Sequence, residues 1–123
     1  MTEVKYLTKE EIIKAHEKII DETGGVSGIL NDGLLDLVLD QMKISDDLIQ
    51  KSIILLFGII QNHPFVDGNK RIGLECLEVF LDYNNKNFLV KDIQKAEELI
   101  LNVANNDISR NKVRKWIGSC IGD

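Results

Sequence analysis

The segment from His63 to Arg71 holds the side chains of this chain that are best suited to chemistry. His63 could take a proton from a hydroxyl that attacks phosphorus, because an imidazole titrates near neutral pH. Asp67 offers an oxygen ligand to Mg²⁺, which proteins usually hold through one or two carboxylates together with the phosphates of a nucleotide. Lys70 and Arg71 supply a point charge and a bidentate fork for phosphate oxygens. The set predicts phosphoryl or nucleotidyl transfer, in which positioning and charge neutralisation do most of the work.

The other residues of this segment would shape it. Pro64 restricts the backbone of the residue before it, and Phe65 is an apolar residue between polar neighbours, which we expect to anchor the loop in the core. Gly68 lets the backbone approach a phosphate closely and turn into the next helix. Asn69 could cap that helix or donate to a phosphate oxygen. The segment therefore predicts an anion site at a helix N-terminus.

Two other interpretations of this segment, a plain turn and a nuclease site, compete with a phosphate site. Asp-Gly-Asn is ordinary turn chemistry, and a lone histidine between helices is usually a turn residue, but a plain turn has no use for four such charged or titratable groups together. A metal-dependent nuclease would gather several carboxylates around its ions, whereas this segment offers Asp67 alone. We therefore prefer a phosphate site.

Composition narrows the class of protein. A length of 123 residues fits one domain, residues 1–123, and the net charge of -5 opposes general attraction to nucleic acid. The basic residues near the C-terminus are expected to be a solvated helix face. Cys76 and Cys120 lack the spacing of a metal site or a disulfide framework, so a reducing cytoplasm is expected. We expect neither a signal peptide nor a membrane span, because the N-terminus has no apolar stretch and the apolar run 53–60 is too short.

Apolar residues recur at helical spacing along most of the chain, and strand patterns are nearly absent. The pattern predicts an all-α fold, a compact bundle of about six helices, with a loop or short hairpin in the glycine-rich segment Gly24 to Gly33. The third helix is apolar nearly all round and should be the buried centre. The first helix is expected to begin with a capping box of Thr8 and Glu11 and to end near Thr23, and the second to begin at Asn31 or Asp32. The third should run from Ser45 or Asp46 to about Asn62, and the fourth from after Gly68 to Asn84-Asn85. The last two should begin at Asp92 and at Ser109.

The stretch HPFVDGNKR, followed by IGLECLEVFLDYN, strongly resembles the signature of the Fic fold, and in particular of its death-on-curing (Doc) branch, the toxins of type II toxin–antitoxin modules. The stretch GGVSGILNDGLLDLVLDQ and its spacing to the motif are also similar, so the resemblance covers most of the chain. By residue, the resemblance implies a general base at His63, a core anchor at Phe65, a magnesium ligand at Asp67, an anion-binding turn at Gly68 and Asn69, and phosphate contacts at Lys70 and Arg71.

One departure from the wider family bears on the reaction. Fic adenylyltransferases typically carry Gly-Asn-Gly-Arg with a second arginine three residues later, and this chain has Lys70 and Leu74 at those positions. A lysine adds bulk and charge where phosphates would lie, and the second guanidinium fork is missing, so a different nucleotide pose is expected. Doc-type toxins with Asn-Lys-Arg act as kinases on a threonine of elongation factor Tu and arrest translation. The resemblance thus implies an ATP- and Mg²⁺-dependent protein kinase; the alternatives are an adenylyltransferase and a catalytically silent module that binds an antitoxin.

Three further expectations concern partners and packing. The segment Gly24 to Gly33 would correspond to the flap that aligns the target peptide in the family, with a plain loop as the alternative. We find no self-inhibitory Ser/Thr-xxx-Glu-Gly/Asn helix, so an antitoxin with a disordered tail would act in trans by folding into a groove on the toxin. His16 and Trp116 are expected to pack in or at the border of the core.

Overall fold

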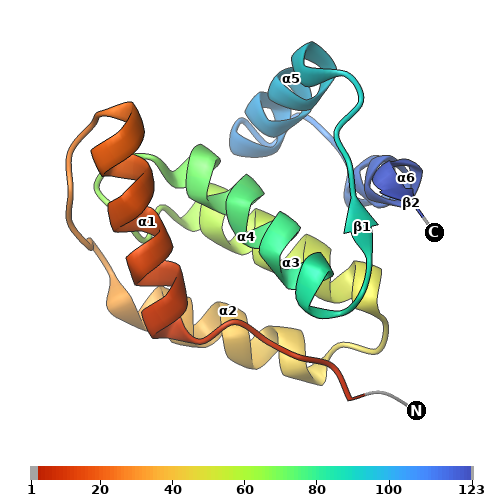
Figure 1. The fold of residues 1–123 in the computed structure, drawn as a ribbon, viewed down its shortest axis with the longest axis horizontal. Coiled ribbons are helices and arrows are strands. Elements are labelled where there is room, and N and C mark those ends of the chain that lie inside the picture. The colour runs from red at the N-terminus through yellow and green to blue at the C-terminus, as the bar shows by residue number, and fades with distance from the viewer. Residues whose placement is uncertain (1–2, 123) are drawn as a thin grey trace.

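The computed structural model describes residues 3–122, so residues 1, 2 and 123 of the predicted domain lie outside the described residues. Within that range the chain forms six helices and one pair of two-residue strands, which confirms the all-α prediction (Figure 1). The elements are α1 (Lys9–Thr23), α2 (Asp32–Ile44), α3 (Leu48–Asn62), α4 (Asn69–Tyr83), β1 (Asn87–Phe88), α5 (Ile93–Ala104), α6 (Arg110–Cys120) and β2 (Ile121–Gly122).

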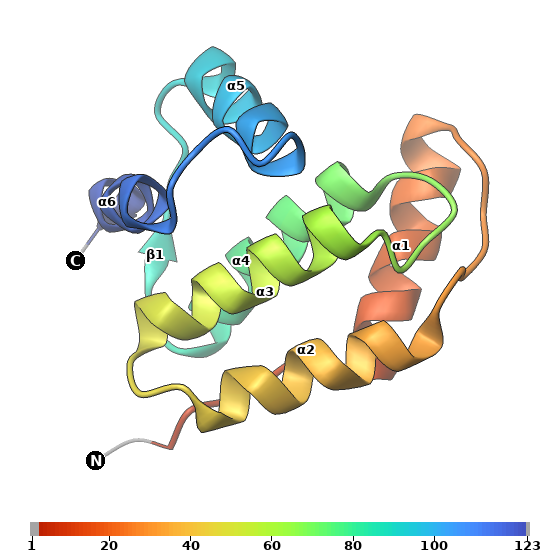
Figure 2. The same ribbon diagram turned by 180° about the vertical axis from the view of Figure 1, so that it is seen from behind.

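Helices α3 and α4 run side by side through the middle of the molecule. Figures 1 and 2 show α1 and α2 on one side of this pair and α5 and α6 on the other. The apolar side chains of α3 accordingly face two clusters: Leu55 and Ile59 pack with α1 and α2, whereas Leu56 and Ile60 pack with α5 and α6. The prediction that the third helix is the buried centre is confirmed, and a helix that serves two cores needs apolar residues nearly all round.

Local capping signals set most helix boundaries. Thr8 and Glu11 form the predicted capping box, and the side chains of Asp92 and Ser109 accept from the N–H groups of Lys95 and Lys112 at the starts of α5 and α6. These three predicted starts are confirmed.

The predicted start of α3 was wrong by one or two residues. Asp47 is the N-cap, and Ser45 instead ends α2. The reason lies one turn into α3, where the buried Lys51 donates from Nζ to the carbonyl oxygens of Met42 (2.8 Å) and Ser45 (2.5 Å). A cation there satisfies the last carbonyls of α2, so Ser45 belongs to the end of that helix.

Two short strands join the end of the described chain to the segment after α4. Asn87 pairs with Gly122 and Phe88 with Ile121 in an antiparallel ladder. Phe88 then meets the indole of Trp116 edge-on at 5.6 Å between ring centroids, and Trp116 is buried, so its predicted place in the core is confirmed. Both cysteines are free and buried. In residues 3–122 no helix has both the length and the apolar character to cross a membrane.

Replacing Gly73 with alanine should lower the free energy of unfolding by about 1–3 kcal/mol, as overpacking in a filled core does. The added Cβ would lie 2.7 Å from Cγ1 of the buried Ile60, where α4 crosses α3. Urea denaturation measures the change. Gly118→Ala is the matched control, because no heavy atom lies within 4 Å of its added Cβ, and it should leave stability unchanged or raise it by up to about 1 kcal/mol. Equal effects of the two variants would contradict the packing argument.

Candidate active site

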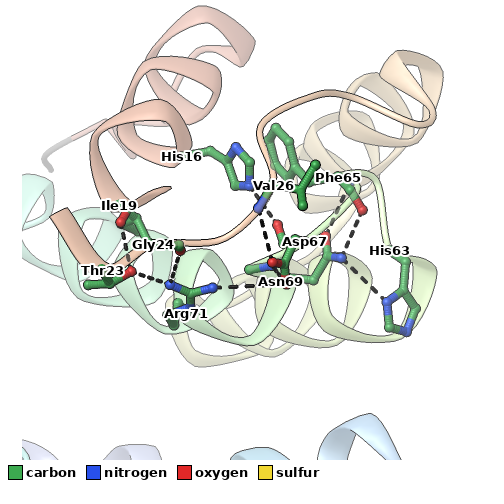
Figure 3. Close-up of polar contacts among 11 residues, drawn as sticks. His16, Ile19, Thr23, Gly24, Val26, His63, Phe65, Asp67, Asn69 and Arg71 are labelled. Carbon is green, nitrogen blue, oxygen red and sulfur yellow. Dashed lines mark hydrogen bonds and ion pairs between the residues drawn. The ribbon is translucent and has the colours of Figure 1, made fainter. Parts of the chain in front are cut away.

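The loop between α3 and α4 carries the predicted motif (Figure 3). It begins and ends with a residue in the left-handed region. His63 closes α3 at φ 50° and its N–H donates to the carbonyl of Ile59 (3.3 Å), while Gly68 precedes α4 at φ 76°. Between them the Phe65 side chain is fully buried, as predicted for the anchor of the loop. The sharp reversals at both ends leave the polar residues of the loop at one end of the α3–α4 pair.

The amide of Asn69 closes this loop from inside. Asn69 is buried, its Oδ1 accepts from the N–H of Phe65 (3.1 Å), and its Nδ2 donates to the carbonyl of Phe65 (2.9 Å). The expectation that its side chain caps α4 was wrong, because Gly68 is the N-cap and no side chain caps this helix. With its side chain turned inward, Asn69 can offer an anion only its backbone N–H.

The start of α4 has the properties of an anion site. The first bond of the helix runs from the N–H of Ile72 to the carbonyl of Gly68 (2.9 Å). The N–H groups of Asn69, Lys70 and Arg71 therefore have no acceptor within the helix. The first turn of α4 contains no acidic residue, so the positive end of the macrodipole is not neutralised from within the helix.

The Asp67 carboxylate is held in one orientation by backbone donors. Its Oδ2 accepts from the N–H of Val26 (3.1 Å) and its Oδ1 from the N–H of Gly68 (2.8 Å), and Nη2 of Arg71 lies 3.9 Å from Oδ1. These contacts lower the pKa of Asp67, the hydrogen bond from Val26 most and that from Gly68 next. The side chain is 45% exposed, so an ionised oxygen ligand faces solvent.

The two cations of the motif differ in their surroundings. Arg71 bonds the Thr23 hydroxyl and donates from Nη1 to the carbonyl of Gly24 (3.0 Å), so its guanidinium holds the C-terminal end of α1. Lys70 is exposed and forms no ion pair with any residue of the described range 3–122. Lys70 is thus free to meet an anion, whereas Arg71 would exchange protein acceptors for it.

His63 lies at the opposite end of this row of polar residues from Arg71, with Asn69 and Asp67 between them (Figure 3). Its ring is exposed, and its Nδ1 lies 3.4 Å from Nδ2 of Asn69. Because that Asn69 nitrogen is a donor, Nδ1 acts as the acceptor and a neutral ring carries its proton on Nε2. The contact is long, so the exposed ring is weakly held and can turn.

The glycine-rich segment covers the motif loop and pairs with it. Ile29 and Phe65 form an antiparallel bridge, in which the N–H of Leu30 donates to Pro64 (2.8 Å) and the N–H of Val66 donates to Gly28 (3.0 Å). A Cβ on Gly25, which has φ 118°, would lie 2.6 Å from Oδ2 of Asp67, so only glycine lets the segment approach this closely. We call residues 24–31 the flap.

His16 is fully packed, as expected, but it also touches the motif. Its Nε2 lies 2.7 Å from the carbonyl oxygen of Asp67, and its ring stacks on Phe65 with centroids 3.8 Å apart and planes 9° apart. We did not predict this contact, because the two residues are far apart in sequence. The available signal was a polar residue between Ile12 and Ile20 on the apolar face of α1.

Two further features bear on ligands. Residues 3–122 contain no group of three or more His, Cys, Asp and Glu residues placed to hold a metal ion. The Asp67 carboxylate could supply one oxygen ligand to a metal. A cavity of about 560 Å³ lies between α4 and α5, large enough for a small ligand; Lys70 and Arg71 line it at the start of α4, and its other walls are mainly apolar.

A family comparison matches residues 6–81 to the Fic/DOC family, and the chain belongs to that family. The chain is also 26% identical over 116 residues to "Protein kinase doc" of Escherichia phage P1, which covers 89% of this chain and 90% of that protein. It is 29% identical over 121 residues to "Toxin Doc" of Mycolicibacterium smegmatis, covering 92% of this chain and 89% of that protein. The family resemblance predicted from the motif is confirmed.

Asn69→Ala should lower the free energy of unfolding by about 1–3 kcal/mol, because it leaves the N–H and carbonyl of Phe65 without partners inside the protein. Thermal or urea denaturation measures the loss. Asn62→Ala, at an exposed position at the end of α3, is the control and should stay within about 0.5 kcal/mol of the wild type. A harmless Asn69→Ala would show that the loop holds its shape without this amide.

Proposed function

We propose that this protein is an ATP- and Mg²⁺-dependent protein kinase of the Doc type, which phosphorylates a threonine of elongation factor Tu and so arrests translation in the cytoplasm. In this proposal it is the toxin of a type II toxin–antitoxin module. The observation that carries the proposal is the start of α4, which no side chain caps. It is flanked by the oriented carboxylate of Asp67, the free ammonium of Lys70 and the exposed imidazole of His63.

Each residue of the loop has a separate task in this reaction. Magnesium-bound ATP supplies the phosphoryl group. Asp67 would hold the metal, because its carboxylate is ionised and both its oxygens are aimed by backbone N–H groups. The N–H groups at the start of α4 and the side chains of Lys70 and Arg71 would bind phosphate oxygens and neutralise their charge.

His63 would remove the proton from the acceptor hydroxyl. A general base needs an unprotonated nitrogen within hydrogen-bond reach of that hydroxyl. Nδ1 faces the donor Nδ2 of Asn69 across a long contact of 3.4 Å, so in the neutral ring this would be the unprotonated nitrogen. A turn of the exposed ring would present this nitrogen to the acceptor, and the left-handed backbone of His63 keeps the ring at the open end of α3.

The surroundings of Leu74 favour phosphoryl transfer over AMP transfer. Leu74 stands where the wider family carries a second arginine, and here it packs partly buried against the α5–α6 core and lines the cavity beside Lys70. An apolar wall offers no fork to phosphates, so phosphates would gather at the start of α4 instead. That shift is consistent with a pose in which the terminal phosphate faces the acceptor.

Incubation of the purified protein with ATP, Mg²⁺ and elongation factor Tu should add a single phosphate to a threonine of the factor, as read by intact-mass and fragment spectra. His63→Ala should lower the rate by about 10²–10⁴-fold, the usual contribution of a general base. Asp67→Asn should abolish phosphate transfer, because it removes the proposed ligand of Mg²⁺. Asp46→Asn is the control, because Asp46 is an exposed carboxylate outside the motif, and it should behave as the wild type.

The product distinguishes the proposal from its alternatives. A mass gain equal to AMP on the factor would make the protein an adenylyltransferase. No modification, together with tight binding of a cognate antitoxin, would make it a silent binding module.

Expression of the chain without an antitoxin should stop growth, and His63→Ala should relieve the arrest. Co-expression of the antitoxin encoded beside it should also restore growth, because the proposal places control in trans. Growth measured by optical density, with equal protein levels checked by immunoblot, tests this. Equal harmlessness of the wild type and His63→Ala would contradict the toxin assignment.

A further inference from the structure

We propose that His16 is a positioning residue for the metal and phosphate site, acting through the peptide unit that joins Asp67 to Gly68. This inference rests on the proposed function, because it assigns His16 a part in the same site. His16 lies on α1, outside the motif, and its side chain has no exposed path to a substrate, since the residue is 1% exposed.

The first step concerns the proton on His16. Its Nε2 lies 2.7 Å from the carbonyl oxygen of Asp67, and a carbonyl oxygen can only accept, so Nε2 carries a proton and donates it. A leucine would also suit the apolar face of α1 between Ile12 and Ile20, but it could not donate to this carbonyl. The Asp67 carbonyl accounts for a histidine here, because burying that acceptor without a donor would cost free energy of folding.

The second step is geometric. The carbonyl of Asp67 and the N–H of Gly68 belong to one planar peptide unit, so a donor that holds the oxygen also sets the direction of the N–H. That N–H donates to Oδ1 of Asp67 at 2.8 Å. The hydrogen bonds therefore run in series from His16 through the peptide to the carboxylate, and bonds in such a chain polarise one another.

The third step concerns the rigidity of the donor. The His16 ring stacks on Phe65 with planes 9° apart (Figure 3), and Phe65 is itself held by the amide of Asn69. A carboxylate aimed through a fixed outer partner binds metal more tightly than a mobile one.

The test compares two substitutions of His16. His16→Phe keeps an aromatic ring on Phe65 but removes the donor, whereas His16→Gln keeps a donor of similar reach without the stacked ring. Calorimetric titration of the full chain with magnesium and a non-hydrolysable ATP analogue should show about tenfold weaker binding for His16→Phe, the lower end of the usual loss for outer partners of a metal ligand. His16→Gln should recover most of the affinity.

Kinetics should separate positioning from general stability. The Mg²⁺ concentration that gives half the maximal rate should rise about tenfold in His16→Phe while the KM for the acceptor protein stays unchanged. Ile12→Ala is the matched control: Ile12 is buried one turn earlier on the same face, and its truncation should lower stability without altering the dependence on Mg²⁺.

Three outcomes decide the matter. If the wild type binds no magnesium nucleotide, the proposed function fails. If the wild type binds and His16→Phe binds equally well with the same dependence on Mg²⁺, only the role of His16 is overturned. Should His16→Phe not fold, nitrogen-15 NMR of the wild type still tests the proposal: the His16 ring must carry its proton on Nε2, protected from exchange with water, and a rapidly exchanging or absent Nε2 proton overturns it.

Discussion

The clamp of the Asn69 amide on the backbone of Phe65 is the interaction on which the rest of the site depends. The flap satisfies the carbonyl of Pro64 and the N–H of Val66, but the N–H and carbonyl of Phe65 find their partners in the Asn69 side chain. One side-chain amide supplies both missing partners. With Phe65 fixed, its ring becomes the surface on which His16 lies, and the carbonyl of Asp67 comes within reach of that histidine.

The charges of Asp67 and Arg71 have partners within the protein before any ligand binds, whereas Lys70 forms no ion pair in residues 3–122. Arg71 faces the carboxylate of Asp67 and the carbonyl of Gly24, the residue that follows α1, and Asp67 faces two backbone donors. A phosphate would therefore replace existing partners of Arg71 and meet new ones at Lys70 and at the start of α4. A phosphate bound at the start of α4 would therefore share the Arg71 guanidinium with Gly24 of the flap.

Local chemistry made much of the fold predictable from the sequence. The capping box at Thr8 and the caps at Asp92 and Ser109 depend on residues three positions apart, so the sequence alone shows them. The start of α3 depends on where the Lys51 ammonium points, and the β1–β2 pair is too short to show an alternating pattern. These contacts are set by packing, which a pattern along the chain does not reveal.

The candidate site also has features that the sequence predicts and features that it does not. Residue types and spacing singled out His63, Asp67, Lys70 and Arg71, but the inward turn of the Asn69 amide follows from Gly68 already serving as the N-cap. The bond between His16 and Asp67 joins residues 51 positions apart, and the tie from Arg71 to Gly24 spans 47. The Arg71 contact leaves no pattern in the local sequence, and the His16 contact shows there only as a polar residue on the apolar face of α1.

The division of the interior into two clusters that share α3 and α4 has a mechanical consequence. Helices α1 and α2 belong to one cluster and α5 and α6 to the other, and the flap hangs from the first. A disturbance in the α5–α6 half, whether a mutation or a bound molecule, must travel through the two middle helices before it reaches the flap. Because α4 begins at the motif loop and ends where the chain leaves for the α5–α6 half, a small tilt of α4 would move both of its ends.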